Sequence, residues 1–257
     1  MMRELRLLLC AVQFLTRMPV PALKGFEPEW ITQSARYFPV VGQLVGAISA
    51  LALMLAAPIW SGAVPVALAL TVGILVTGAF HEDGLADTAD GLGGGRDKAH
   101  RLAIMKDSRI GTYGALALLL ALALKVAALS TLPPLTAAFV LIAGHGAARA
   151  AAVTVMALLP YAGDAEAAKY KPVPHGVGAL SCIVGSIFVA WPFIAFTFPN
   201  ALAALVVGGL FAFIMALTSR RLIGGITGDV LGAVEQVFEI GFFLAVAAHW
   251  SAVGSVP

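Results

Sequence analysis

Apolar runs long enough to cross a bilayer recur along the whole chain, and short polar connections separate them. Because about 20 apolar residues are needed to span the hydrocarbon core, each run predicts a transmembrane helix. The pattern therefore predicts an all-α fold, a polytopic membrane helix bundle. These helices and their loops use nearly all of the 257 residues, so we expect a single integral-membrane domain over 1–257. The seven predicted spans have approximate bounds 38–60, 63–80, 112–130, 135–159, 177–198, 201–217 and 237–253.

A shorter apolar run, residues 7–15, follows Arg3 and Arg6 at the N-terminus. A secretory signal peptide has this general form. Here, however, no small-x-small cleavage site follows the run, and Arg17 and Pro19 come next. We therefore expect an N-terminal interfacial or re-entrant helix.

Composition supports a membrane location and excludes one class of partner. Hydrophobic residues make up 60% of the chain and charged residues 12%, a balance that favours lipid over water as the main solvent. The net charge of +2 gives no electrostatic support for nucleic-acid binding, so we expect the lipid bilayer and small molecules as partners, and no nucleic acid. The sequence leaves the oligomeric state open and allows a homo-oligomer.

The charged residues indicate which ends of the spans share a side. The connections at 61–62, 131–134 and 199–200 carry no charge, whereas those at 81–111, 160–176 and 218–236 carry many. Of the 16 basic residues, 14 lie before the first span or in these charged connections, which predicts that the N-terminus and charged connections are cytoplasmic. We expect a multi-pass protein of the cell inner membrane. Thirteen of the 14 acidic residues share this side, which orientation does not require, so we expect the domain to be catalytic there.

The densest acidic segment directly follows the second predicted span. Asp83, Asp87 and Asp90 are spaced i, i+4, i+7, which places their carboxylates on one face if the segment is helical. Like charges so close together are tolerated when cations lie between them, and an all-oxygen ligand set suits Mg²⁺, or Mn²⁺, rather than Zn²⁺. The alternative is a solvated acidic helix end.

Glycine and basic residues follow the acidic segment. Four of the five residues at 91–95 are glycine, which we expect to release the chain from helical geometry and to let the backbone N–H groups of Gly93 and Gly94 approach an anion. A flexible linker has the same composition. Beyond it, Arg101, Lys106 and Arg109 are candidates to hold phosphate oxygens, the alternative being that they only fix orientation.

Four charged residues need separate interpretation. Arg149 lies about 10 residues inside its span, roughly 15 Å at the helical rise, which favours contact with an anionic substrate group. Glu239 lies just inside the last span and would face the acidic cluster. Asp229 is a candidate ligand or helix cap. Lys125 lies near the outer end of its span, where it would extend outward, and no role is assigned to it.

Four segments together resemble the cobalamin synthase family, the adenosylcobinamide-GDP ribazoletransferases, and the resemblance covers nearly the whole chain. They are residues 14–19 (FLTRMP), 37–42 (YFPVVG), 82–111 and 224–229 (GGITGD). The resemblance implies a Mg²⁺-dependent transfer of adenosylcobinamide phosphate from adenosylcobinamide-GDP to α-ribazole or its 5′-phosphate, with release of GMP.

The chemistry that the resemblance implies suggests a role for each candidate. Asp83, Asp87 and Asp90 would bind the metal ion, with Glu82 and Asp229 as additional ligands. Three basic residues, Arg101, Lys106 and Arg109, would hold the diphosphate. Both His81 and Asp90 are candidates for the base that takes the hydroxyl proton, and the sequence does not choose between them.

Two rival functions share part of this pattern. A membrane prenyltransferase also places aspartates at a membrane surface to hold a diphosphate through Mg²⁺, and it would act on an isoprenoid chain. An ion-coupled transporter would use Arg149 and Glu239 as midplane sites. The gathering of acids at one surface and the lack of an internal repeat argue against the transporter.

Overall fold

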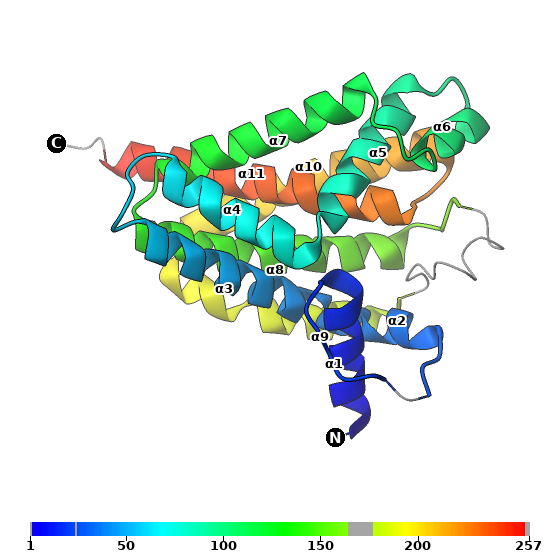
Figure 1. The fold of residues 1–257 in the computed structure, drawn as a ribbon, viewed down its shortest axis with the longest axis horizontal. Coiled ribbons are helices and arrows are strands. Elements are labelled where there is room, and N and C mark those ends of the chain that lie inside the picture. Colours follow the sequence, from blue (N-terminus) through cyan, green and yellow to red (C-terminus); the bar gives the residue numbers. More distant parts are fainter. Residues whose placement is uncertain (1, 24, 164–176, 255–257) are drawn as a thin grey trace.

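The computed structural model describes residues 2–23, 25–163 and 177–254, and these are almost entirely helical (Figure 1). Within them the only strand-like pairing is an isolated bridge between Tyr161 and Ile226, so the predicted all-α bundle is confirmed. The charged connection predicted at 160–176 lies mostly outside these residues. The helices are α1 (Met2–Leu15), α2 (Glu29–Ser34), α3 (Phe38–Ala56), α4 (Val64–Thr77), α5 (Phe80–Gly94), α6 (Lys98–Met105), α7 (Thr112–Ser130), α8 (Pro134–Leu158), α9 (Ala179–Val189), α10 (Phe198–Ile223) and α11 (Gly228–Gly254), with 3₁₀ turns at Ala35–Tyr37 and Trp191–Ala195.

Five helices of the described chain are long and apolar enough to cross a membrane, and a sixth span exists if α4 and α5 are counted as one bent unit. The five are the continuous run Glu29–Ala56, α7, α8, α10 and most of α11. Of the seven predicted spans, five are thus long enough by themselves, and the one at 63–80 is so only together with α5. The run at 177–198 forms the 11-residue α9 and the 3₁₀ turn Trp191–Ala195, because Pro192 has no N–H to continue the α-helical ladder.

The other shortened span is α4, which stops at a sharp break. Gly78 and Ala79 both adopt left-handed φ values, 67° and 59°, and α5 leaves at 89° to α4. The N-terminal FLTRMP segment packs on this break: the backbone N–H of Arg17 donates to the carbonyl of Val76, 2.7 Å away, and the ring of Phe14 contacts that of Phe80. The break turns the acidic segment away from the direction of the second span.

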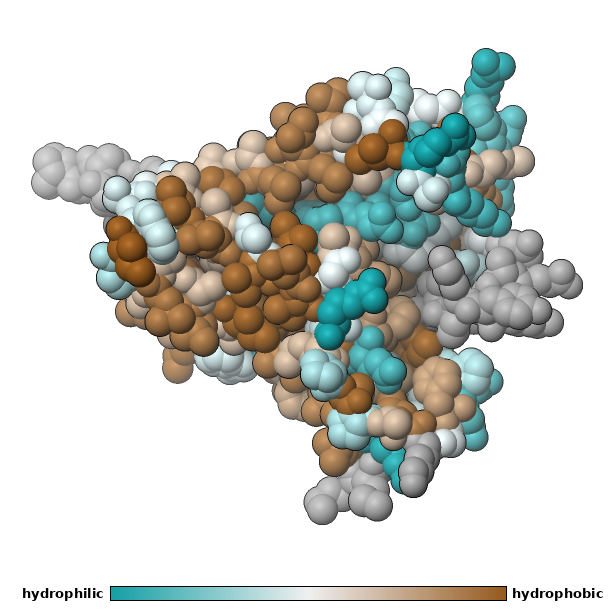
Figure 2. All heavy atoms as spheres, viewed as in Figure 1, coloured by the Kyte–Doolittle hydropathy of each residue, from teal (hydrophilic) through white to brown (hydrophobic). Residues whose placement is uncertain are grey.

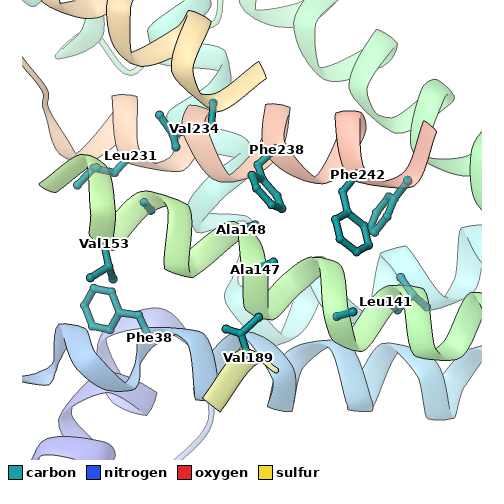
Figure 3. Packing of buried hydrophobic residues seen from close by; sticks show 14 of the residues in the cluster. Phe38, Leu141, Ala147, Ala148, Val153, Val189, Leu231, Val234, Phe238 and Phe242 are labelled. Carbon is teal, nitrogen blue, oxygen red and sulfur yellow. The ribbon is translucent and has the colours of Figure 1, made fainter. Parts of the chain in front are cut away.

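The centre of the bundle is formed by α8 and α11. In the apolar membrane-spanning part of each helix, the buried share is 72% for α8 and 83% for α11. It is only 28% for α7 and 22% for α10, so α7 and α10 face outward. Figure 3 shows Phe38 of α3 against Val153 of α8, while Phe238 and Phe242 of α11 pack on the other side of α8. These contacts make α8 and α11 the rigid frame on which the polar residues are placed.

The hydropathy of the surface changes from one end of the molecule's long axis to the other. Hydrophobic residues cover the spanning helices, whereas hydrophilic residues gather at the end that carries α5 and α6 (Figure 2). At that end α1 runs across the direction of the spanning helices (Figure 1). It buries Leu7, Cys10, Ala11 and Leu15 and exposes its charged first turn, an arrangement that suits a helix lying along an interface.

Candidate active site

The acidic segment forms a helix, α5, with its predicted aspartates close together on it. Asp83 is exposed, Asp87 is half-buried and Asp90 is buried. Burial, followed by the negative charges of Asp83, Asp229 and Asp90, raises the pKa of Asp87 to about 7. This helix lies outside the five spans. Four carboxylates from α5 and α11 thus share one electrostatic environment that favours a cation or a proton.

Asp229 reaches this environment because α5 and α11 pack closely at two glycines. A Cβ on Gly84 would lie 2.7 Å from the backbone oxygen of Asp229, and one on Gly232 would lie 3.1 Å from the carbonyl oxygen of His81. Larger residues would push the helices apart. The cap of α11 is Thr227, whose hydroxyl accepts from the N–H of Val230 at 3.2 Å, so the alternative of Asp229 as the cap was wrong.

The five predicted metal ligands do not form one preassembled cluster. Among the residues that the structure describes, no three His, Cys, Asp or Glu side chains are already grouped around a metal position. Asp90 accepts the backbone N–H groups of Gly111 (2.7 Å) and Gly114 (2.8 Å) and so caps the start of α7. Glu82 points elsewhere, toward Gln236 of α11, at 3.0 Å. Asp83, Asp87 and Asp229 stay candidates on the face between α5 and α11, and the hydroxyl of Thr227 donates to Asp229 at 3.4 Å.

The glycine-rich segment differs from its prediction. Gly93 and Gly94 are the last two residues of α5 and Gly95 follows it in an extended conformation, so the expected release from helical geometry at Gly93 and Gly94 was wrong. The glycines are needed for packing instead. A Cβ on Gly93 would lie 2.9 Å from the ring of Tyr113, and Gly95 lies against the side chain of Arg101. Both Gly93 and Gly94 are exposed, as an anion contact requires.

The three basic candidates surround the other side of this segment. Arg101 is half-buried on α6, and its Nε has no hydrogen-bond partner within the described chain. Lys106 is exposed. Arg109 is bound to Asp107 at 2.6 Å, and its hydrogen bonds lower the pKa of Asp107 to about 2. Arg101 and Lys106 are therefore better placed than Arg109 to receive a phosphate.

A second polar group lies inside the bundle, where the spanning helices bring six side chains together. Lys125 of α7 binds Glu239 of α11 at 2.6 Å, and Arg149 of α8 binds the same carboxylate at 3.0 Å. Arg149 also lies 3.3 Å from Glu235, which is 3.0 Å from Nε2 of His81. We call the six residues the buried charge network: His81, Lys125, His145, Arg149, Glu235 and Glu239.

The buried charge network corrects two expectations. Lys125 is only 2% exposed and points inward, so its outward extension was wrong. Glu239 faces Lys125 and Arg149, not the acidic cluster. Arg149 is likewise an internal ion-pair partner, and its predicted contact with a substrate stays a prediction. His145 is four residues before Arg149 on α8, and both lie near Glu239.

Sequence reasoning missed Glu235 and Gln236. Glu235 was counted only as one more acid near the polar end, and Gln236 carries no charge to attract notice. One signal was available: Glu235 and Glu239 are spaced i, i+4, so a helix places both carboxylates on one face of the last span. Acids on an intramembrane face call for cationic partners, and Lys125 and Arg149 were the only basic residues within spans.

An apolar bundle of spanning helices with an acidic helix turned across one end defines a polytopic membrane protein whose reactive groups gather at one surface. Residues 7–247 match the family described as cobalamin-5-phosphate synthase, and the chain belongs to that family.

Curated relatives agree over nearly the full length. The chain is 46% identical to an adenosylcobinamide-GDP ribazoletransferase from Leptothrix cholodnii, over 97% of this chain and 98% of the relative. It is 39% identical to one from Vibrio cholerae (95% and 94%) and 40% identical to one from Shewanella frigidimarina (96% and 96%). No solved structure matches the chain.

Proposed function

We propose that this protein is an adenosylcobinamide-GDP ribazoletransferase that catalyses a joining step late in cobalamin biosynthesis. Its substrates are adenosylcobinamide-GDP and α-ribazole, or α-ribazole 5′-phosphate. The products are adenosylcobalamin, or its 5′-phosphate, and GMP. The observation that carries this proposal is the 39–46% identity to relatives of that name over almost the whole chain.

The reaction is a phosphate transfer. A ribose hydroxyl oxygen of α-ribazole forms a bond to the cobinamide-side phosphorus, and the bond from that phosphorus to the oxygen of GMP breaks. The hydroxyl proton passes to a base, and GMP leaves with the bonding electron pair. Catalysis of such a step consists mainly of positioning and of stabilising negative charge.

The metal in this proposal is Mg²⁺, with Mn²⁺ as the alternative. Asp83, Asp87 and Asp229 would hold it, because they are oxygen donors that share one face and because burial, followed by the neighbouring negative charges, raises the pKa of Asp87. When bound, the ion would neutralise negative charge on the diphosphate. Asp90 contributes mainly by capping α7, and Glu82 by its bond to Gln236.

The diphosphate is assigned to the basic side of the same end. Arg101 and Lys106 would bind its oxygens, with Gly93 and Gly94 exposed beside them, while Arg109 would first have to leave Asp107. Both candidates for the base already have partners: His81 faces Glu235 and Arg149, and Asp90 holds two backbone N–H groups. The identity of the base stays a prediction.

The membrane assignment has two levels. The five spans make this a membrane protein. The inner membrane and a cytoplasmic position for the N-terminus, α5 and α6 are part of the proposal, supported by the 14 basic residues on that side.

Product formation tests the function directly. Purified protein in lipid is incubated with adenosylcobinamide-GDP, α-ribazole and Mg²⁺, and adenosylcobalamin and GMP are sought by mass spectrometry. A parallel reaction contains a prenyl diphosphate. We expect adenosylcobalamin and GMP to form in the first reaction and no prenyl transfer in the second. Folded protein that forms neither product, or that consumes the prenyl diphosphate, contradicts the proposal.

A further inference from the structure

Backbone continuity alone does not fix the rotation of α5 about its own axis. The helix starts directly after two left-handed residues, Gly78 and Ala79, and at 89° to α4. Rotation decides whether Asp83 and Asp87 face Asp229, because side chains on a helix point in fixed directions. Contacts outside the α4–α5 connection must therefore determine the rotation of α5 about its axis.

Two consecutive side chains in the first turn of α5 contact two consecutive side chains of α11. His81 places Nε2 3.0 Å from Oε2 of Glu235. Glu82 accepts a hydrogen bond from Nε2 of Gln236 at 3.0 Å. Two positions further along the helix, Gly84 touches the backbone of Asp229. These three contacts hold α5 in one rotation, with Asp83 turned outward and Asp87 beside Asp229.

Glu235 and Gln236 of α11 are themselves bound by basic side chains of α8 and α7. Arg149 binds Glu235 through Nε at 3.3 Å, and Lys125 donates to Oε1 of Gln236 at 2.7 Å. Glu239 joins these two cations. Two buried cations thus meet two buried carboxylates, so each charge has an opposite charge to offset its desolvation. Long side chains that would otherwise sample several rotamers are locked.

We propose that Glu235 and Gln236 are positioning residues, which act through His81 and Glu82 to hold the acidic face of α5 in its metal-binding orientation. The inference rests on the proposed metal-assisted transfer. In this arrangement His81 is an anchor and not the base, since its side chain is 2% exposed, Nε2 faces Glu235 and Nδ1 lies 3.4 Å from Arg149. The pocket beside the network has room for about one water molecule, about 20 Å³.

Substitutions of His81 separate an anchor from a base. In His81→Gln the side-chain amide keeps a polar N–H group that can face Glu235, whereas His81→Phe has none. We expect Mn²⁺ affinity, measured by electron paramagnetic resonance on the full chain in lipid, to be near wild type in His81→Gln. In His81→Phe it should fall about 10-fold or more, the usual loss when the group supporting a metal ligand is removed. Turnover should follow Mn²⁺ affinity in both variants.

A second variant covers the case in which His81→Phe does not fold. Gln236→Glu keeps an acceptor for Lys125 but presents a carboxylate to Glu82, and we expect the same weakening of Mn²⁺ binding. The matched control is His249→Phe, near the far end of α11, which should leave Mn²⁺ affinity and turnover unchanged.

Three outcomes overturn the inference. One is wild-type Mn²⁺ affinity in folded His81→Phe or Gln236→Glu. Another is a His81→Gln variant that binds Mn²⁺ normally but has lost turnover, since that result makes His81 a chemical participant. The third is wild-type protein that forms product without binding Mn²⁺. Wild-type protein that binds Mn²⁺ but forms no product instead contradicts the proposed transferase activity, and the positioning role is then judged by Mn²⁺ affinity alone.

Discussion

Asp87 is the residue at which the crowding of carboxylates has its clearest consequence. Its pKa of about 7 means that a proton competes with any metal ion at neutral pH. We predict that Mn²⁺ affinity strengthens as pH rises through about 7, and that Asp87→Asn removes this dependence. The stability of the metal-free protein should change in the opposite sense, falling as pH rises from about 4 to about 7, because the pKa in the folded state lies above its ordinary value of 3.8. Metal titrations and thermal unfolding at several pH values measure both effects.

The same residue should be indispensable for turnover. We predict that Asp87→Asn lowers kcat about 100-fold or more, as is common when a group that stabilises developing charge is lost, while the protein remains folded. Glu27→Gln, at an exposed position before the first span, serves as the control. Near-normal turnover of Asp87→Asn across a Mg²⁺ titration would show that the metal assignment is wrong.

Asp90 should behave differently because its carboxylate caps a helix. Asp90→Ala leaves the N–H groups of Gly111 and Gly114 without their acceptor, which should lower the free energy of unfolding by about 1–2 kcal/mol. Asp90→Asn keeps one oxygen acceptor and should lose less. Unfolding in detergent by denaturant measures the difference, and equal stability of the alanine variant and the wild type would exclude the capping role.

At the scale of elements, the α4–α5 break requires glycine at Gly78 for two reasons. Its φ is 67°, and a Cβ there would run into the side chain of Arg17. Gly62 has the same φ, but a Cβ at that position would have no atom within 4 Å. We predict that Gly62→Ala costs about 1 kcal/mol from backbone strain alone and that Gly78→Ala costs more. Comparative unfolding of the two variants tests this, and equal losses would mean that the Arg17 contact is unimportant.

Helices were predictable where apolar periodicity decides the structure, and less so where tertiary contacts do. The long spans at α7, α8, α10 and α11 follow from apolar length. The break at Ala79 does not, since alanine favours a helix and its left-handed φ is imposed by packing. The helical state of Gly93 has a similar cause: α5 is held by α6 and Tyr113.

The residues of the candidate site likewise fall into those that the sequence predicts and those that it does not. The acidic face of α5 was predictable because its residues are neighbours in sequence, so helical spacing alone brings them together. The buried charge network was not, because Lys125, Arg149 and Glu239 come from three helices. Their pairing depends on the angles at which those helices cross, and one sequence does not contain that information.

For the whole molecule, the charge distribution predicts that the two ends of the bundle lie on opposite sides of the membrane. With Cys10 and Cys182 replaced by serine, a cysteine at Ser108 should react with a membrane-impermeant maleimide only from the cytoplasm. A cysteine at Ser61, in an uncharged connection, should react only from the other side. Labelling of intact cells and of inverted vesicles checks this, and the reverse pattern would contradict the proposed orientation.

The shortness of α4 sets the depth at which α5 begins. Its 14 residues cover about 21 Å at the helical rise, roughly a third less than the thickness of a hydrocarbon core of about 30 Å. An α4 that begins at the opposite surface of the bilayer therefore places the first turn of α5 below the level of the lipid headgroups. In that position either the acyl chains around this side of the protein are compressed, or water follows the helix inward to reach its carboxylates. Lipid chain length then acts on the end of the protein that carries α5.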